Sequence, residues 1–241
     1  MLAALIVEGR KLNRSLAAVL AVAAPTLIAI FLFFNMLRGD EPQEWAMWLQ
    51  ASLGIWAFFM LPMSVTALTA LVAHMEHGPR AWDHLRALPV ARWKLYAAKA
   101  AWVVLIVAAM SLLNLAFTLA AVKAAVAVKP VLAPTGPMDL MGQVGMVGKV
   151  VLAGLLLTAI QLWTALRFSS FVPALALGIG GTFFSVVATA AKQGVFFPWQ
   201  MPINMLATET WRVQTAFGLG CGLGLALMVL AIAQLARREV L

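Results

Sequence analysis

Six apolar runs, each long enough to cross a lipid bilayer, constrain the fold of this chain more than any other feature. A membrane-spanning helix needs about 20 mostly apolar residues. The chain is 63% hydrophobic and 11% charged, whereas soluble domains are about 45–50% apolar and about 25% charged, so a soluble fold is excluded. The sequence predicts one all-α integral membrane domain over residues 1–241, with six transmembrane helices at about 16–37, 45–73, 95–122, 147–166, 171–191 and 213–235.

The distribution of Lys and Arg predicts the orientation of these helices. Six spans place both termini on one side of the membrane, and the side richer in Lys and Arg is normally cytoplasmic. Eleven of the 17 basic residues fall on the side of the termini: Arg10, Lys11, Arg14, Arg80, Arg86, Arg92, Lys94, Lys99, Arg167, Arg237 and Arg238. Both termini are therefore expected in the cytoplasm. The net charge of +8 is explained by this topology and by contact with the lipid bilayer, and no nucleic-acid partner is expected.

The N-terminal residues 2–14 form a candidate amphipathic helix. Its charged residues follow its first apolar residues, which is not typical of a signal peptide. Apolar residues recur at helical spacing, while Glu8, Lys11 and Arg14 occupy other positions. A short helix lying at the membrane surface is predicted.

A charged segment, EHGPRAWDHLRALPVARWKLYAAK at residues 76–99, lies between the second and third spans. Proline is tolerated at the first position of a helix and disfavours helical geometry at the residue before it, so a short helix is predicted over about 79–88. Trp82, Leu85 and Leu88 follow one another at steps of three and share one face. The alternative is a solvated loop whose basic residues only fix the topology.

This segment resembles the cytoplasmic coupling-helix region of ABC-2 type ABC transporter permeases, and most closely the bacitracin-export and lantibiotic-immunity group. The residues that carry the resemblance are Glu76, Trp82, Leu85, Leu88, Pro89, Arg92, Leu95 and Lys99. The six spans, the N-terminal helix with Glu8, Lys11 and Arg14, and the segment FFPWQMPIN at 196–204 are also similar to that family. The N-terminal helix would then be the family's elbow helix.

The resemblance implies a permease subunit in a bacterial cytoplasmic (inner) membrane. It would have no enzymatic activity or cofactor of its own. It would pair with a second permease chain, identical or paralogous, and with two ABC ATP-binding subunits that bind MgATP. The substrate would be an exported amphipathic, peptide or lipid-like compound. The expected interface with the ATPase comprises Glu76, Gly78, Arg80, Trp82, Asp83, Leu85, Arg86, Leu88, Pro89 and Arg92.

Other motifs in the sequence have structural explanations. In GQVGMVGKV at 142–150, Gln143 occupies the place of the first glycine of a phosphate-binding loop, and Val150 replaces the hydroxyl residue. The run GLGCGLGLAL at 218–227 contains the pairs Gly218/Gly222 and Gly220/Gly224, which favour close helix packing in membranes. The three histidines near residues 74–84 do not form a metal-binding pattern. No catalytic, cofactor or metal residue is expected.

Several polar residues within the spans are candidates for lining a transport path: Asn114, Thr118, Gln161, Thr164 and Ser185. The alternative for each is hydrogen bonding between helices, which is common in membrane proteins. A second interpretation of the whole chain is a multi-span channel, or a membrane scaffold that recruits a cytoplasmic partner through residues 78–90.

Overall fold

The structure is a computed structural model that describes residues 1–13, 15–77, 91–189 and 191–237. Helices account for the regular structure of this part of the chain, and no strand is formed in it. The helices before the charged segment are α1 (Leu2–Asn13), α2 (Leu16–Arg38), α3 (Trp45–Ile55), the π-helix η1 (Trp56–Met60) and α4 (Leu61–His77). After the charged segment come α6 (Arg92–Val128), η2 (Pro130–Leu132), α7 (Leu140–Ala153), α8 (Leu155–Arg167), α9 (Val172–Ala188), η3 (Lys192–Phe196), α10 (Met201–Asn204), α11 (Thr210–Phe217), the π-helix η4 (Gly218–Leu223) and α12 (Gly224–Arg237).

Four continuous helical segments among the described residues are long and apolar enough to cross a membrane. They are Leu16–Arg38, Trp45–His77, Arg92–Val128 and Thr210–Arg237. The α7–α8 pair becomes a fifth if its 42° bend is counted within one span, and α9 is shorter, with 17 residues. A helix therefore lies at each of the six predicted positions, but the number of spans by length and composition is four or five. The six-span count stays a prediction.

The helix α6 extends beyond the predicted span of 95–122 at both ends. Its 37 residues make it about 56 Å long at 1.5 Å per residue, whereas the hydrocarbon core of a bilayer is about 30 Å thick. Lys123 is exposed on α6 close to its C-terminal end. The predicted span of 95–122 was bounded by where the hydropathy falls. A helix can continue past such a boundary, because its backbone hydrogen bonds do not require apolar side chains.

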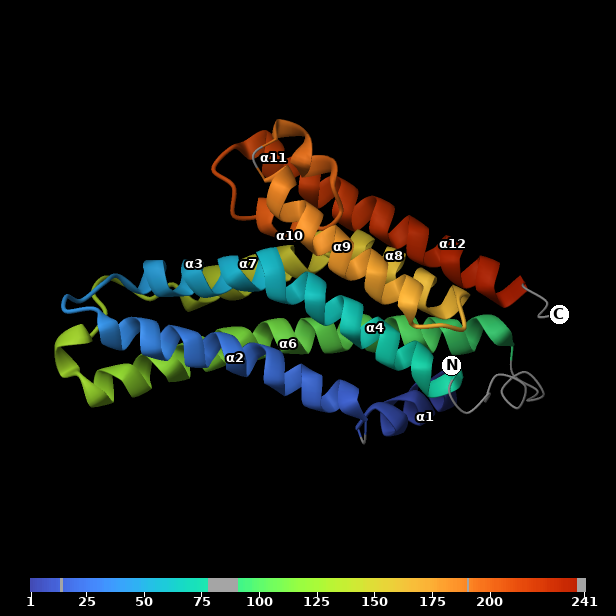
Figure 1. The fold of residues 1–241 in the computed structure, drawn as a ribbon, viewed down its shortest axis with the longest axis horizontal. Coiled ribbons are helices and arrows are strands. Elements are labelled where there is room, and N and C mark those ends of the chain that lie inside the picture. The colour runs from blue at the N-terminus through green and yellow to red at the C-terminus, as the bar shows by residue number, and fades with distance from the viewer. Residues whose placement is uncertain (14, 78–90, 190, 238–241) are drawn as a thin grey trace.

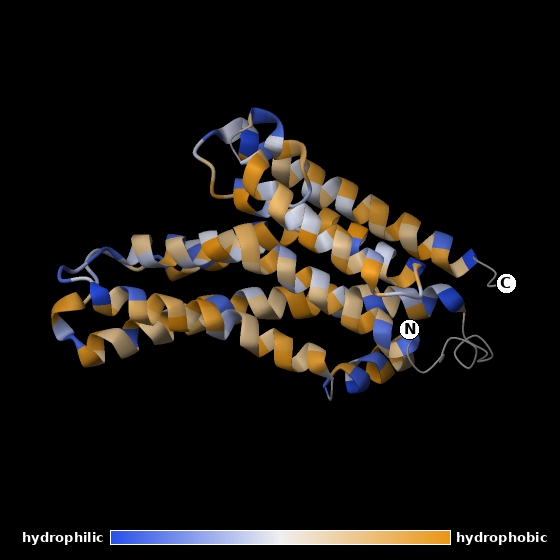
Figure 2. Ribbon diagram, in the orientation of Figure 1, coloured by the Kyte–Doolittle hydropathy of each residue, from blue (hydrophilic) through white to orange (hydrophobic). Residues whose placement is uncertain are grey.

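The helices pack as two groups (Figure 1). In the first, α2 lies along α6 and α4 contacts both; in the second, α12 packs on α8, and α4 joins the two groups through α8 and α9. Hydrophobic residues cover the lengths of the helices and hydrophilic residues gather at their ends (Figure 2). Along α2 alone, the exposed apolar side chains are Leu16, Val19, Val22, Leu27, Ile30, Phe31 and Phe34. This surface is suited to lipid.

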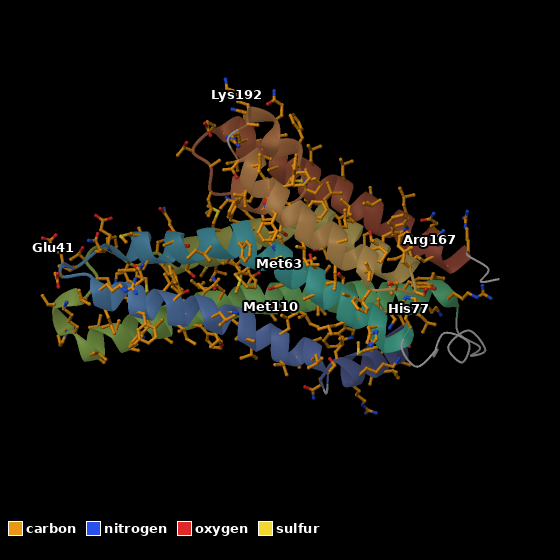
Figure 3. The ribbon with its side chains drawn as sticks, viewed as in Figure 1. Glu41, Met63, His77, Met110, Arg167 and Lys192 are labelled. Carbon is orange, nitrogen blue, oxygen red and sulfur yellow. The ribbon has the colours of Figure 1, made fainter. Side chains whose placement is uncertain are left out.

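The two ends of the molecule differ in what they hold. Glu41 and His77 lie at opposite ends (Figure 3). At the end with Glu41, Lys129 Nζ donates to Asp40 Oδ1 at 2.9 Å and to the carbonyl oxygen of Gly39 at 2.8 Å. These bonds tie the α2–α3 connection to the end of α6. The end with His77 holds α1, the end of α4 and the start of α6.

Three helices are irregular at one level of the molecule. The π-helix η1 ends just before Leu61, the helix α7 bends into α8 at Gly154, and η4 interrupts the last long helix. A Cβ added at Gly154 would lie 3.5 Å from Leu61 Cδ2. A Cβ on Gly220 would lie 2.8 Å from Ala153 Cα, and one on Gly224 would lie 2.5 Å from the backbone nitrogen of Leu156. Gly220 and Gly224 of the last span therefore pack directly on the bend.

The predicted glycine pairs differ in their surroundings. Close packing is confirmed for Gly220 and Gly224 by the contacts with the α7–α8 bend. A Cβ on Gly218 or Gly222 would meet no atom within 4 Å in the described chain. Only one of the two pairs therefore lies in a contact between helices of the chain.

Candidate functional site

The predicted coupling helix falls on residues that the structure does not describe. Gly78, Arg80, Trp82, Asp83, Leu85, Arg86, Leu88 and Pro89 all lie outside the described residues, as does Arg14 of the predicted elbow helix. The described chain reaches residues 78–90 from both sides, at the end of α4 and just before the start of α6. Of the predicted interface residues, Arg92 is exposed at the first position of α6 and Glu76 is buried one residue before the end of α4.

Glu76 belongs to a cluster of four charged side chains, which also includes Glu8, Lys11 and Lys99. Lys99 Nζ donates to Glu8 Oε2 at 2.7 Å and to Glu76 Oε1 at 2.8 Å. Lys11 Nζ donates to Glu76 Oε1 at 2.8 Å and lies 3.4 Å from Glu8 Oε1. This four-residue ion cluster joins α1, α4 and α6, and it carries two positive and two negative charges.

The ion cluster is almost completely removed from solvent. The exposed fraction is 2% for Glu8, 0% for Glu76 and 1% for Lys99, whereas the Lys11 side chain is 33% exposed. Burying charges is costly, and the attraction between the partners offsets that cost only when the geometry is good and each charge has a partner. Each lysine bonds to both glutamates, so every charge has a partner, but Glu76 Oε2 is buried without a hydrogen bond among the described residues.

Lys11 is the member of the cluster that lies nearest to solvent. Its burial alone would lower the pKa of the ammonium group, but hydrogen bonds and charges from Glu76 and Glu8 outweigh this effect and raise the pKa above its ordinary value. A lysine whose pKa is raised in the folded state contributes stability below its unfolded pKa and loses it only as pH rises through the folded pKa. Lys11 therefore stays charged throughout the neutral range.

A close contact between α1 and α6 holds the glutamate of α1 in place. Trp102 Nε1 donates to the carbonyl oxygen of Leu5 at 2.8 Å. The indole also lies against Gly9, where an added Cβ would come within 2.5 Å of Trp102 Cζ2. Glycine at position 9 thus allows α1 to approach α6 closely enough for Glu8 to reach Lys99. The helix predicted over residues 2–14 is found over Leu2–Asn13, and its position at a membrane surface stays a prediction.

The polar residues of α6 form an interhelical network with α3. Ser52 Oγ and Thr118 Oγ1 are 2.6 Å apart, and Asn114 Nδ2 donates to Ser52 Oγ at 3.0 Å. One helical turn or so away, Trp56 Nε1 donates to Ser111 Oγ at 3.0 Å. All five side chains are buried. The hydrogen bonds of Asn114 Nδ2 and Thr118 are those expected for helix packing, whereas Asn114 Oδ1 is buried without a hydrogen-bond partner among the described residues.

The other three candidate path residues are also buried and hydrogen-bonded within the chain. Gln161 packs between α8 and α9, where its amide, in the orientation that satisfies both groups, donates to the carbonyl oxygen of Ala174 at 3.2 Å and accepts from Gly178 N at 3.0 Å. Thr164 and Ser185 donate to carbonyl oxygens of their own helices at 2.9 Å and 2.6 Å. A role in lining a path stays a prediction for all five.

Replacing Thr118 with valine separates helix packing from a role in transport. We expect Thr118→Val to lower the free energy of unfolding by about 0.6 kcal/mol, the average for a hydrogen bond between membrane helices, and to leave transport unchanged. Thr26→Val is the matched control, because the Thr26 hydroxyl donates only to the carbonyl oxygen of Val22 in its own helix. A change in transport without a change in stability would instead favour the path-lining role.

Sequence reasoning did not bring the four members of the ion cluster together. Glu8 and Lys11 were assigned to the elbow helix and Glu76 to the partner interface, whereas Lys99 was counted among the basic residues that predict the orientation and noted within the resemblance. Two features of the sequence could have indicated the cluster. Each of the four charged residues lies next to an apolar run, and the two positive charges balance the two negative ones. Among the described residues, no three His, Cys, Asp or Glu side chains come together in a way that could hold a metal ion.

A family model described as "ABC-2 family transporter protein" matches residues 4–187. The matched range contains α1 from its third residue onward, the whole charged segment, and all four members of the ion cluster. No curated protein matches, and no solved structure matches.

Proposed function

The chain belongs to the ABC-2 family of transporter proteins, and from this membership we propose that it is a permease subunit whose ion cluster transmits the movement of residues 78–90 to the membrane helices. An ABC-2 permease is a membrane transport component and not itself an enzyme, and such permeases generally work with an ABC ATP-binding subunit. The energy for transport would thus come from another chain.

The observation that carries this proposal is the position of the ion cluster on both sides of residues 78–90. Glu76 lies at the end of α4 and Lys99 lies in the second turn of α6, and their side chains are joined at 2.8 Å. The same lysine bonds to Glu8 of α1. Any displacement of the segment between α4 and α6 therefore acts on three helices together, since their charged groups cannot separate without exposing unpaired charges to an apolar environment.

The finer assignments rest on the resemblance of the charged segment. The partner ATPase would bind MgATP and be present in two copies, and a second permease chain, identical or paralogous, would complete the transporter. The substrate would be an amphipathic compound, peptide-like or lipid-like, moved outward across a bacterial cytoplasmic membrane. Both termini and the charged segment would then face the cytoplasm.

Variants of the charged segment test the coupling role. We expect Trp82→Ala and Arg86→Glu to abolish co-purification with the ATPase and ATP-dependent transport, because buried aromatic and arginine side chains carry much of the binding energy of an interface. Membrane insertion should be unchanged. The measurement is a mild-detergent pull-down of the tagged chain, identification of the bound chains, and an ATPase assay.

Two exposed residues outside the segment provide matched controls. Arg237→Glu makes the same charge reversal at the end of α12, and Trp211→Ala removes an indole that is 46% exposed on α11. Both should retain the ATPase. Normal pull-down and transport in the Trp82 and Arg86 variants would exclude the coupling role, and stoichiometric capture of a partner without ATPase motifs would favour the scaffold interpretation.

A further inference from the structure

A groove of about 500 Å³ lies between α1, the start of α2, and α6. Its walls are formed by Ile6 and Leu12 of α1, Ala17, Ala18 and Ala21 of α2, and Trp102 and Ile106 of α6. The two polar residues of the lining, Arg10 and Asn13, both belong to the C-terminal half of α1, and the part of the groove beside them is called its polar end. The groove is separate from the ion cluster, none of whose members lines it.

Small residues create this groove. Three alanines face it from the first two turns of α2, where longer side chains would fill the space between α2 and α6. Gly9 lets α1 approach Trp102, so that the indole forms one wall and its nitrogen is occupied by the carbonyl oxygen of Leu5. Because the indole N–H is already hydrogen-bonded, Trp102 presents only its apolar ring surface to the groove. This part of the groove is therefore suited to a hydrocarbon chain.

Arg10 supplies the charge at the polar end. Its side chain is exposed, and none of the carboxylates in the described part of the chain forms an ion pair with it. The neighbouring Lys11 differs, because it is directed into the ion cluster and is bound to Glu76. A guanidinium group is suited to a phosphate, which it binds through two parallel hydrogen bonds.

We propose that this groove binds one anionic phospholipid of the surrounding membrane, with its phosphate at Arg10 and Asn13 and one acyl chain along Ala18, Ala21 and Ile106. The groove begins on a helix with exposed apolar residues, among them Leu2, Ile6 and Val7, and continues along the exposed apolar surface of α2. A lipid matches this order of a charged end followed by an apolar trough. A helix of another protein that occupied the groove would need an acidic residue beside Arg10 to pair with its charge.

Native mass spectrometry of the full chain in mild detergent tests the proposal. The chain is titrated with equal amounts of dioleoyl phosphatidylglycerol and dioleoyl phosphatidylcholine, which have the same acyl chains. We expect the first bound lipid to be phosphatidylglycerol with a preference of about fivefold, the amount that one basic residue near an anionic headgroup contributes. Arg10→Gln should reduce that preference to about onefold.

Two matched controls separate the groove from the rest of the surface. Arg38→Gln removes the same charge at the other end of α2 and should keep the preference. Ala21→Leu fills the groove and should reduce binding of both lipids, whereas Ala23→Leu, on the exposed face of the same helix, should not. Equal binding of the two lipids, or an unchanged preference in Arg10→Gln, would overturn the proposal. A chain dimer that Ala21→Leu dissociates would overturn it in favour of contact with a second copy.

Discussion

Replacing Lys99 with methionine is expected to lower the free energy of unfolding by about 3–5 kcal/mol, the cost of removing one partner from a buried ion pair. The side chain of Lys99 is completely buried and bonds to both glutamates of the ion cluster. Methionine is similar in length, so little packing is lost. Lys11 remains, but it lies 3.4 Å from Glu8 and cannot replace both bonds. Unfolding of the detergent-solubilised chain, followed by circular dichroism, gives the measurement.

A control and a compensating variant make this prediction specific. Lys123→Met makes the same change at an exposed position of the same helix and should alter stability little. Adding Glu8→Gln to Lys99→Met removes one of the stranded negative charges, so the double variant should be more stable than Lys99→Met alone. If Lys99→Met and Lys123→Met unfold alike, the four charges do not hold α1, α4 and α6 together.

Alanine at Gly220 and alanine at Gly222 are expected to have effects of opposite sign. A Cβ on Gly220 would lie 2.8 Å from Ala153 Cα, and because backbone cannot move aside as a flexible side chain can, Gly220→Ala should destabilise the chain by about 1–3 kcal/mol. At Gly222 an added Cβ meets no atom within 4 Å. There the gain in helix propensity should stabilise the chain by about 0.5–1 kcal/mol.

Gly220→Ala and Gly222→Ala differ in little besides the surroundings of the added methyl group. Both glycines lie in η4, two residues apart, and both receive the same methyl group. Thermal unfolding of the two variants beside the unmodified chain gives the signs directly. Destabilisation by Gly222→Ala equal to that by Gly220→Ala would mean that the last span does not pack on the α7–α8 bend through one face.

Hydropathy was sufficient to predict where the helices lie, because a run of about 20 apolar residues must satisfy its backbone hydrogen bonds internally. It was not sufficient for their ends or their irregularities. The helix α6 extends to Val128, beyond the apolar run that ends at about residue 122, and the π-helices η1 and η4 interrupt runs that hydropathy treats as uniform. For the glycines, spacing alone could not distinguish Gly220, which touches α7, from Gly222, which does not.

The candidate site was predicted one residue at a time. The sequence marked Glu8, Lys11 and Glu76 as residues of interest, since charges beside apolar runs are few. Their association depends on a contact between α1 and α6, which are 91 positions apart at Glu8 and Lys99. That contact requires the close approach of Gly9 to Trp102. The spacing of apolar residues in the sequence does not indicate this approach.

The balanced charges of the ion cluster also determine what the cluster itself contributes to a response to voltage. Moving one elementary charge through a membrane potential of 100 mV changes the free energy by about 2.3 kcal/mol. Two ammonium and two carboxylate groups that move together as a unit carry no net charge through that field. A rigid displacement of α1, α4 and α6 would consequently involve no electrical work on the cluster, whether the membrane is energised or depolarised.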